Sequence, residues 1–373
     1  MKVSFGTAIK LGLTNGRLSY DPKTAYLLLG SNCKFHCSYC GINSSQIARV
    51  RWPDYPSKVV IDKLKQANFK RVCLQLSSDG IDEALDLVGK LPSLRSVCIR
   101  TKDIERIKTF FSSGADTVAI PLDAVTPEIS RQVKRGEWFE TLELLKTAAN
   151  LFPKRIWTHL IIGLGEKEEE TVHLMQRLHT LGVGISLFSF VPVSGTPLEH
   201  QSHPSINSYR RIQIARWLIE NEAQSKFEFN SRGELVNFST PSRDAFLTCG
   251  CKDCDRLYYD SSPTHPYNFP EVNEEQYQKA VNEAKTWRGK STYKAEKLIR
   301  VKVEYSARIT KINITGDFFL YPEKQIEKIE RALSGAPVDK KIINEIISEG
   351  LEGAKPFGFS SEDLTFAIME AIK

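Results

Sequence analysis

The 373-residue sequence lacks any long hydrophobic run. Its longest apolar stretches, such as residues 185–193, have the length of a strand, whereas a membrane-spanning helix needs roughly 20 apolar residues. The first residues also lack the continuous apolar core and the cleavage site of a secretory signal. We therefore expect a cytoplasmic protein without a membrane partner.

The sequence also lacks a large excess of positive or negative charge: its formal net charge is only +6. This value is too small to indicate a nucleic-acid-binding protein, and we expect no nucleic-acid partner. Hydrophobic residues make up 41% of the chain and charged residues 26%, as in ordinary globular proteins. The length suffices for one large domain and a smaller one.

Eight cysteines need an explanation, because disulfides are disfavoured in a reducing compartment. Cys73 and Cys98 stand alone in apolar runs, and we predict that both are core residues, since free cysteine is among the most buried residue types. The other six form a first cysteine set (Cys33, Cys37 and Cys40) and a second cysteine set (Cys249, Cys251 and Cys254).

The first cysteine set has the spacing C-x3-C-x2-C and directly follows the apolar run 25–29. Three thiolates can hold three irons of a cubane, whereas an ordinary electron-carrying cubane uses four. The fourth iron would then be open to a substrate, as in other catalytic metal sites. A zinc knuckle or buried free thiols are the alternatives, but zinc sites usually need a second ligand pair at similar spacing.

This spacing, with Tyr39 just before the third cysteine, resembles the signature of radical S-adenosylmethionine (SAM) enzymes. The resemblance implies a [4Fe-4S] cluster on Cys33, Cys37 and Cys40 whose open iron binds the amino and carboxylate groups of SAM, with Tyr39 among the cofactor-binding residues. One electron, from a donor such as a ferredoxin, then splits SAM into methionine and a 5′-deoxyadenosyl radical.

Strand-like and helix-like runs alternate from residue 25 to residue 221. Such alternation predicts parallel strands joined by right-handed crossovers, and six units fit an open, partial (βα)6 barrel of the α/β class. The site of such a barrel lies at the carboxyl ends of its strands. The expected strands are 25–29, 71–76, 94–99, 117–122, 156–162 and 185–191, and the expected helices are 59–65, 81–91, 104–111, 139–151, 168–181 and 209–221.

Polar residues at several strand ends resemble the SAM-contacting segments of this family. Ser77 and Ser78 stand where a Gly-Gly-Glu segment often binds the amino group of SAM, although a polar turn with Asp79 as a helix cap explains them equally well. Asp123 stands where an aspartate commonly approaches the SAM ribose or the substrate. Arg135 resembles the basic partner of the SAM carboxylate, or it is a solvated surface charge.

The next two strand ends resemble the parts of these enzymes that surround the adenosyl group. Residues 161–166 match the G-x-G-E strand ending of the biotin synthase and elongator-like subgroups. Gly163 and Gly165 would let the backbone approach the adenosyl group closely. Val191 lies in a segment that resembles the sixth strand ending, whose apolar residues line adenine. A Rossmann fingerprint would need a third glycine and an earlier position.

The second cysteine set, with spacing C-x-C-x2-C, lies beyond the alternating region and precedes a stretch rich in Pro, Tyr and Asp, residues 255–270. Loops of this length are usually functional. A zinc site and a second, auxiliary [4Fe-4S] cluster both remain open, and the resemblance to radical SAM enzymes favours the auxiliary cluster. Ser261, Ser262, solvent and substrate all remain open as its fourth ligand.

The last part of the chain reads as a small α+β C-terminal domain. Residues 285–311 carry nine Lys or Arg against Glu296 and Glu304, a net of +7. Two alternating runs, 299–305 and 309–314, predict an antiparallel hairpin, and helices are expected at 326–333, 338–348 and 360–372. Residues 314–323 closely resemble the accessory domain of lipoate–protein ligases; an unrelated small domain with a positive surface is the alternative.

We therefore predict a radical SAM barrel over residues 1–240, a cysteine-rich auxiliary-cluster segment over 241–285 and a ligase-accessory-like domain over 286–373. Together these features resemble the two-protein lipoyl synthases found mainly in archaea, which pair two radical SAM subunits. The resemblance implies a radical SAM sulfurtransferase of lipoate biosynthesis that inserts sulfur at the sixth and eighth carbons of a protein-bound octanoyl chain. Both cysteine sets would be catalytic and metal-binding.

The implied partners are an octanoylated lipoyl carrier domain or H-protein and a second radical SAM lipoyl synthase subunit. One feature departs from single-chain lipoyl synthases, which hold the auxiliary cluster with cysteines N-terminal to the radical SAM motif. Two other functions remain open: a radical SAM sulfur-inserting or methylthiolating enzyme for another substrate, and a non-catalytic, zinc-containing partner subunit that recruits the carrier. Iron counts separate them, about eight per chain for two cubanes against about four plus one zinc.

Overall fold

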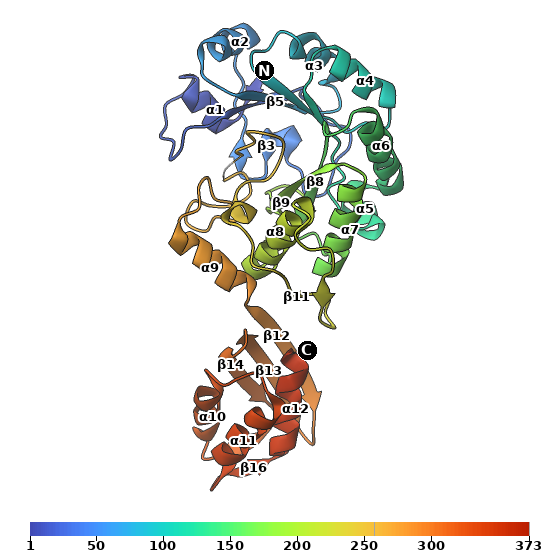
Figure 1. Ribbon diagram of the computed structural model, residues 1–373. Helices are drawn as coiled ribbons and strands as arrows, with labels where there is room; N and C mark the ends of the chain where they lie inside the picture. The colour runs from blue at the N-terminus through green and yellow to red at the C-terminus, as the bar shows by residue number, and fades with distance from the viewer. Residues whose placement is uncertain (257, 373) are drawn as a thin grey trace. The chain divides into compact units, whose positions relative to one another are not determined.

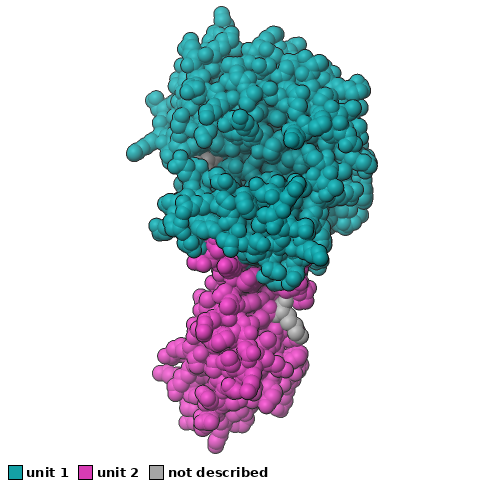
Figure 2. All heavy atoms as spheres, in the orientation of Figure 1, with its two compact units in different colours: residues 1–228, 233–278 teal, residues 229–232, 279–373 magenta. Residues whose placement is uncertain are grey.

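The computed structural model describes residues 1–256 and 258–372. The chain divides into two compact units, which Figure 2 colours separately. The first unit comprises residues 1–228 and 233–278, and the second comprises residues 229–232 and 279–373. Among the described helices, none combines the length and the apolar character needed to span a bilayer.

The first unit is built on a seven-stranded sheet with the order β1-β2-β5-β6-β7-β8-β9. Strand β1 (Lys2–Val3) runs antiparallel to β2 (Thr24–Leu29), and all later neighbours are parallel. These neighbours are β5 (Arg71–Leu76), β6 (Leu94–Cys98), β7 (Thr117–Ala119), β8 (Ile156–Ile162) and β9 (Gly184–Ser189). The parallel strands follow one another in chain order and leave two edges, which is the arrangement of a partial barrel and confirms the predicted fold class.

Helices on the outer side of the strands connect them in this barrel, as Figure 1 shows. They are α2 (Ser57–Gln66), α3 (Ile81–Val88), α4 (Ile104–Ser112), α6 (Trp138–Leu151) and α7 (Glu168–Thr180), with α8 (Ile206–Glu220) after β9. Each forms because its apolar residues recur at helical spacing: α4, for example, buries Ile107 and Phe110 and is capped by the Asp103 carboxylate. All six expected helices are present.

Helix α5 (Pro127–Lys134) was not expected from the sequence. Thr126 caps its first turn by accepting a hydrogen bond from Ile129 N at 3.3 Å, and Pro127 occupies the first helical position, where its missing N–H costs nothing. The helix has only about two turns. This length is too short for the spacing of its apolar residues to indicate a helix in the sequence. This helix matters because Lys134, its last residue, points back into the barrel.

The rest of the first unit consists of short elements and loops. They include α1 (Phe5–Lys10), η1 (Ile42–Ser44), β3 (Gln46–Ile47), β4 (Val50–Arg51), β11 (Leu235–Asn237) and η2 (Arg243–Phe246). Strand β10 (Glu228–Phe229) and helix α9 (Glu274–Ala284) begin in the first unit and end in the second. Helix α9 lies beyond the loop-rich stretch and was not predicted. The second cysteine set lies in turns between η2 and α9.

The second unit contains an antiparallel sheet of β12 (Trp287–Lys294), β13 (Leu298–Tyr305) and β14 (Ile309–Gly316). Ile299, Val301 and Val303 on one face pack with the helices in a single core. These helices are α10 (Gln325–Leu333), α11 (Lys340–Leu351) and α12 (Ser361–Ile372), and a small pair of strands, β15 (Phe319–Tyr321) and β16 (Lys355–Phe357), completes the unit. The predicted hairpin and helices are present, and β12 is an additional strand.

Candidate functional site

The loop that carries the first cysteine set begins directly after β2 and is held by the turn after β5. The Asp79 carboxylate accepts hydrogen bonds from Ser31 N at 3.1 Å and from Asn32 N at 3.0 Å. Gly80 is the N-cap of α3 and no side chain caps this helix, so the interpretation of Asp79 as a helix cap is wrong. Asp79 instead fixes the start of the cysteine loop.

The two serines before Asp79 also hold backbone. Ser77 is buried and donates to Leu29 O at 3.0 Å, and Ser78 Oγ accepts from Lys34 N at 2.9 Å. The predicted contacts of Ser77 and Ser78 with SAM stay predictions. In this structure the side chains of Ser77 and Ser78 hold the end of β5 to the end of β2 and to the cysteine loop through Leu29 and Lys34.

The three thiols of the first set lie close enough to influence one another. Asn43 clamps Cys33 by accepting from its N–H at 2.8 Å and donating to its carbonyl at 3.1 Å, and Cys40 N donates to Cys37 O at 3.1 Å. Burial raises the pKa of the Cys40 thiol to about 12, with a smaller opposing contribution from Ile42 N–H and smaller reinforcing ones from Cys37 and Cys33. Thiols in such a place ionise together only when a bound cation compensates their charge, so this donor set fits a metal cluster.

Arg100, a residue that the sequence did not single out, lies beside this set. Its Nη1 donates to Cys37 Sγ at 3.3 Å, and its guanidinium also pairs with Glu137 at 3.4 Å. Burial raises the pKa of the Cys37 thiol and Asp123 adds to the rise, whereas the Arg100 guanidinium opposes it. Arg100 follows β6 at the same end of the barrel, so its place after a strand was the only available signal.

A buried ion pair anchors the motif tyrosine to the barrel. Tyr39 OH donates to Asp123 Oδ2 at 2.6 Å, and Lys134 Nζ lies 2.8 Å from the same oxygen. Asp123 is 7% exposed and Lys134 is 4% exposed. Burial acts to raise the pKa of Asp123, but Lys134 and His159 together hold it below its usual value, so the carboxylate is ionised near neutral pH.

The basic residue that reaches this place is therefore Lys134, whereas the predicted residue Arg135 is exposed. Arg135 is the left-handed C-cap of α5, with a φ of 64°, and this conformation turns it out of the helix. The predicted role of Arg135 toward the SAM carboxylate stays a prediction. Which residue of this segment faces the barrel depends on the phase of a helix that the sequence did not predict.

The G-x-G-E segment closes the carboxyl end of β8 by a local turn. Gly163 and Gly165 have φ values of 107° and 121°, a region that side chains rarely adopt. The Glu166 carboxylate accepts from Gly163 N at 2.6 Å and from Leu164 N at 3.0 Å. Glycine is thus needed for the backbone path, and the glutamate for its hydrogen bonds.

A cavity of about 150 Å³ lies inside the barrel below these strand ends. Four predicted site residues line it: Tyr39, Cys40, Asp123 and Val191. Its other lining residues are Gln75, His159, Phe188, Ile47, Ala48, Ile161, Ser189 and Phe190. The remaining predicted residues of this end, including Cys33, Cys37, Ser77, Gly163 and Arg135, lie outside this lining.

The second cysteine set lies at the opposite end of the same barrel. Asp255 accepts from Thr24 N at 3.3 Å, and Arg71 Nε donates to Lys252 O at 2.6 Å. Thr24 and Arg71 are the first residues of β2 and β5. The cysteine-rich segment therefore packs against the amino ends of the strands and belongs to the first unit.

The thiols of the second set contact side chains and backbone of the barrel. Cys251 Sγ lies 3.2 Å from Ser96 Oγ, Cys254 Sγ lies 3.5 Å from Tyr26 OH, and Cys249 Sγ accepts from Leu187 N at 3.1 Å. A hydrogen bond with Cys254 lowers the pKa of Cys251 to about 7, although burial opposes the shift. Cys251 is therefore partly a thiolate near neutral pH, which is the form that binds metal.

Thiols of both cysteine sets border cavities inside the barrel, and the two cavities share lining residues. A second cavity is lined by Cys251 and Cys254 together with Cys73 and Cys98, the residues predicted to be core. This cavity shares three lining residues with the cavity of about 150 Å³ described above: Gln75, His159 and Phe188. Cys73 is buried and Cys98 is partly buried, but both thiols border a cavity that also has polar walls.

Neither set converges on a point. Among the described residues, no three His, Cys, Asp or Glu side chains lie close enough to hold a single metal ion. Tetrahedral zinc would require such convergence, because Zn–S distances are about 2.3 Å. The irons of a cubane lie at separate corners, so a cluster does not require its thiolates to converge on one point.

Comparison with known proteins agrees with this geometry. Residues 27–178 match the family model of the Radical SAM superfamily. The chain contains a radical SAM domain. Over 54% of its length it is 28% identical to an uncharacterised protein of Methanocaldococcus jannaschii, of which it spans 58%. Over 61% of its length it is 21% identical to the lipoyl synthase of Picrophilus torridus, of which it covers 82%.

A solved structure is similar to part of the radical SAM chain. It belongs to a study of an archaeal lipoylation system, a bi-partite lipoate protein ligase and its E2 lipoyl domain from Thermoplasma acidophilum. The matched chain is 34% identical, with a TM-score of 0.21, and the match covers 22% of this chain and 96% of that one.

Proposed function

We propose that this chain is a sulfur-inserting radical SAM enzyme that acts on an octanoyl chain bound to a carrier protein, as one subunit of a lipoyl synthase. Its similarity to lipoyl synthases, at 21% identity to that of Picrophilus torridus, supports this choice of substrate. The observation that carries the proposal is the placement of two cysteine sets at opposite ends of one barrel, whose cavities share Gln75, His159 and Phe188. A sulfur-insertion enzyme needs both a radical source and a sulfur source within reach of one substrate chain.

In this proposal the first cysteine set holds a [4Fe-4S] cluster that binds SAM, and the second holds an auxiliary [4Fe-4S] cluster. When bound, these groups would supply a 5′-deoxyadenosyl radical at one end of the barrel and sulfide at the other. Asp123 and Lys134 keep Tyr39 in place beside Cys40, and Val191 offers an apolar surface for adenine.

The residues between the two sites suit an apolar substrate. Phe188, Phe190 and Ile161 give an apolar wall to the cavity that Tyr39 and Cys40 also line. Burial lowers the pKa of His159 to about 4 despite the nearby Asp123, so the imidazole is neutral at pH 7. A neutral histidine does not add a charge to the space that the saturated chain would occupy.

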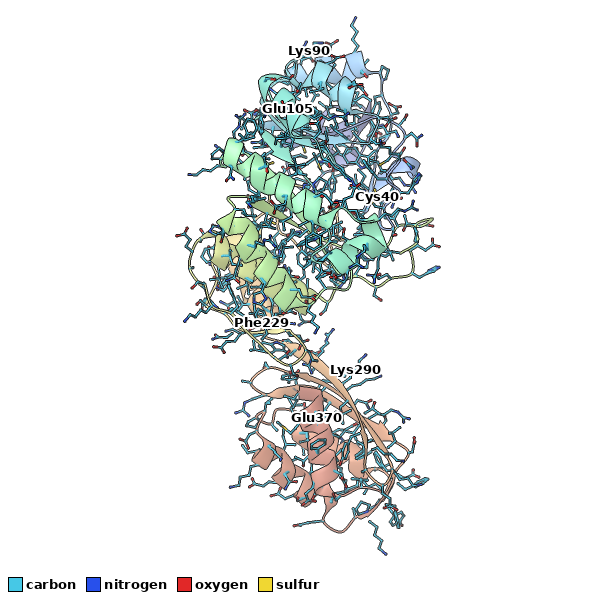
Figure 3. The ribbon with its side chains drawn as sticks, turned by 90° about the vertical axis from the view of Figure 1, so that its right-hand side faces the viewer. Cys40, Lys90, Glu105, Phe229, Lys290 and Glu370 are labelled. Atoms are coloured by element: carbon cyan, nitrogen blue, oxygen red, sulfur yellow. The ribbon has the colours of Figure 1, made fainter. Side chains whose placement is uncertain are left out.

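The second unit offers a surface for an acidic carrier. The sheet face opposite the helices exposes Lys290, Lys294, Lys302 and Lys311, and Lys290 stands opposite Lys302 in the strand register. Figure 3 labels Lys290 on this sheet. We define these four lysines as the basic face. Complementary charge accelerates association and aligns partners, and the resemblance of residues 314–323 to a ligase accessory domain supports a carrier as the partner.

The test is an anaerobic assay with reconstituted protein, SAM, a strong reductant and an octanoyl-lysine peptide or carrier domain. We expect 5′-deoxyadenosine and a product heavier by sulfur, both detected by mass spectrometry, with the companion radical SAM subunit added in a second series. One result would contradict the proposal: 5′-deoxyadenosine forms, but the octanoylated carrier gains no carbon–sulfur bond in either series while another acceptor does. Sulfur insertion into the octanoyl chain would then be excluded.

A further inference from the structure

Cys73, which the sequence predicts to be a core residue, lies in the barrel wall beside the second cysteine set. It lies in β5, where its register partners are Tyr26 on β2 and Ser96 on β6. Neighbouring strands are about 4.8 Å apart, so these three residues form one row across the barrel wall. Cys254 Sγ contacts Tyr26 OH at 3.5 Å and Cys251 Sγ contacts Ser96 Oγ at 3.2 Å. Cys73 thus lies between the two barrel residues that touch the cysteines of the loop.

The Cys73 thiol also borders the same cavity as these cysteines. Its side chain is 9% exposed, and Gln75 Nε2 donates to its sulfur at 3.1 Å. The two serines considered earlier as a fourth ligand lie elsewhere, because Ser261 and Ser262 line a different pocket beside Val191. Two strand thiols, Cys73 on β5 and Cys98 on β6, therefore border the cavity with Cys251 and Cys254, and Cys73 is the one in the row between Tyr26 and Ser96.

Two buried arginines beside these thiols point to an anionic group. Arg71 and Arg256 are 2% and 7% exposed, and neither forms a salt bridge with a carboxylate of the described residues. Arg256 Nη1 lies 3.6 Å from Cys254 Sγ, and Arg71 Nη1 donates to Ser96 Oγ at 2.6 Å. The charge of Arg256 is met in part by the nearby Asp260 carboxylate and by the carbonyls of Cys249 and Leu187, and the Arg71 guanidinium donates to Lys252 O. Both cations also lie beside the thiols, so they would favour a thiolate-ligated iron–sulfur cluster, which carries net negative charge, at this place.

We infer that Cys73 is the fourth thiolate of the auxiliary cluster, completing a four-cysteine set with Cys249, Cys251 and Cys254. The inference rests on the proposed function insofar as that function places an iron–sulfur cluster on the second cysteine set. It adds a ligand from the barrel wall, which would fix the cluster to β5, whereas the other three ligands come from a loop.

The matched control is Cys98, which lines the same cavity but whose sulfur lies 3.8 Å from His159 Nδ1. Both cysteines are compared in a full-length background in which Cys33, Cys37 and Cys40 are replaced by alanine, so that only the auxiliary cluster is counted. The background is expected to bind about four irons per chain after anaerobic reconstitution. Iron and sulfide content, the Mössbauer spectrum and the rate of iron release to a chelator are measured.

We expect Cys73→Ala to change the Mössbauer spectrum and to release iron at least about tenfold faster, because even residues that only support a ligand typically cost tenfold in metal affinity. Cys73→Ser should restore part of the retention through an oxygen ligand, whereas Cys98→Ala should match the background. Circular dichroism of the metal-free variants checks that they fold.

The two possible failures are distinguishable. Identical iron content, spectrum and release rate in the background and in Cys73→Ala would overturn the role of Cys73 and leave the auxiliary cluster intact. A correctly folded background that binds no iron would remove the auxiliary cluster itself, and with it both the ligand assignment and the proposed sulfur donor.

Discussion

Lys134 Nζ lies 2.8 Å from Asp123 Oδ2, and both side chains are almost completely buried. The pair joins the end of α5 to the carboxyl end of the barrel, and the same carboxylate accepts a hydrogen bond from Tyr39 of the cysteine loop. An ion pair next to the loop of the first cysteine set thus couples the stability of the barrel to the position of the proposed cofactor site.

We expect Lys134→Ala to lower the free energy of unfolding by about 3–5 kcal/mol, because it leaves the Asp123 carboxylate buried without its cation. Arg135→Ala is the matched control: its side chain is exposed, and the change should stay within about 0.5 kcal/mol. Urea unfolding followed by circular dichroism measures both. Equal effects of the two substitutions would show that the ion pair is not needed for folding.

The lowered pKa of Asp123 predicts how the stability of the metal-free protein depends on pH. The folded-state pKa is lowered, because Lys134 and His159 outweigh the effect of burial, so ionised Asp123 contributes stability above its ordinary pKa of about 3.9. This contribution is lost as the pH falls through the lower, folded-state pKa. The stability difference between wild type and Asp123→Asn should therefore be constant above about pH 5 and shrink in acid. A difference that grows on acidification would contradict the assignment.

Replacement of Cys33, Cys37 or Cys40 by alanine should abolish cleavage of SAM, since each removes one of three ligands of the proposed cluster. The measurement is the yield of 5′-deoxyadenosine from reduced, reconstituted protein. Cys98→Ala removes a thiol from the barrel interior and serves as the control, with SAM cleavage retained. An undiminished yield in any of the first three variants would remove this set from the radical site.

Cys251→Ala should separate radical generation from sulfur insertion. The variant keeps the first cysteine set, so it should still cleave SAM and abstract hydrogen from the octanoyl substrate. Without its auxiliary cluster it should form no carbon–sulfur bond, which mass spectrometry of the substrate would reveal. If the variant still made thiolated product, the second cysteine set would be structural.

The basic face predicts a dependence on charge that is specific to carrier proteins. Lys290→Glu combined with Lys302→Glu should raise the KM for an octanoylated carrier domain and reduce its salt dependence, because the two lysines stand opposite each other with no carboxylate between them. Activity on a short octanoyl-lysine peptide should change little. Lys340→Glu, an exposed position on α11, is the control with the same change in charge. Equal losses on the peptide and the carrier would exclude docking through this face.

Much of the architecture could be predicted because it is encoded locally. The strands of the barrel contain apolar runs, such as residues 25–29 in β2 and 72–74 in β5, and parallel pairing then follows from the intervening helices. Elements without a strong periodic pattern were missed, among them the short helix α5, α9 beyond the loop-rich stretch, and the edge strand β12, whose alternation is interrupted by Gly289. Propensity and spacing carry little information over such short or mixed segments.

The sequence by itself determined the radical SAM motif, because its three cysteines lie within eight residues and their relation needs no tertiary contact. Only the tertiary structure decided that Cys73 borders the same cavity as Cys251 and Cys254, which follow it by more than 170 positions. It likewise decided that Lys134, and not Arg135, meets Asp123. The physical reasons are tertiary: strand pairing and loop packing bring remote residues to one row, and the phase of a helix selects which neighbour faces inward.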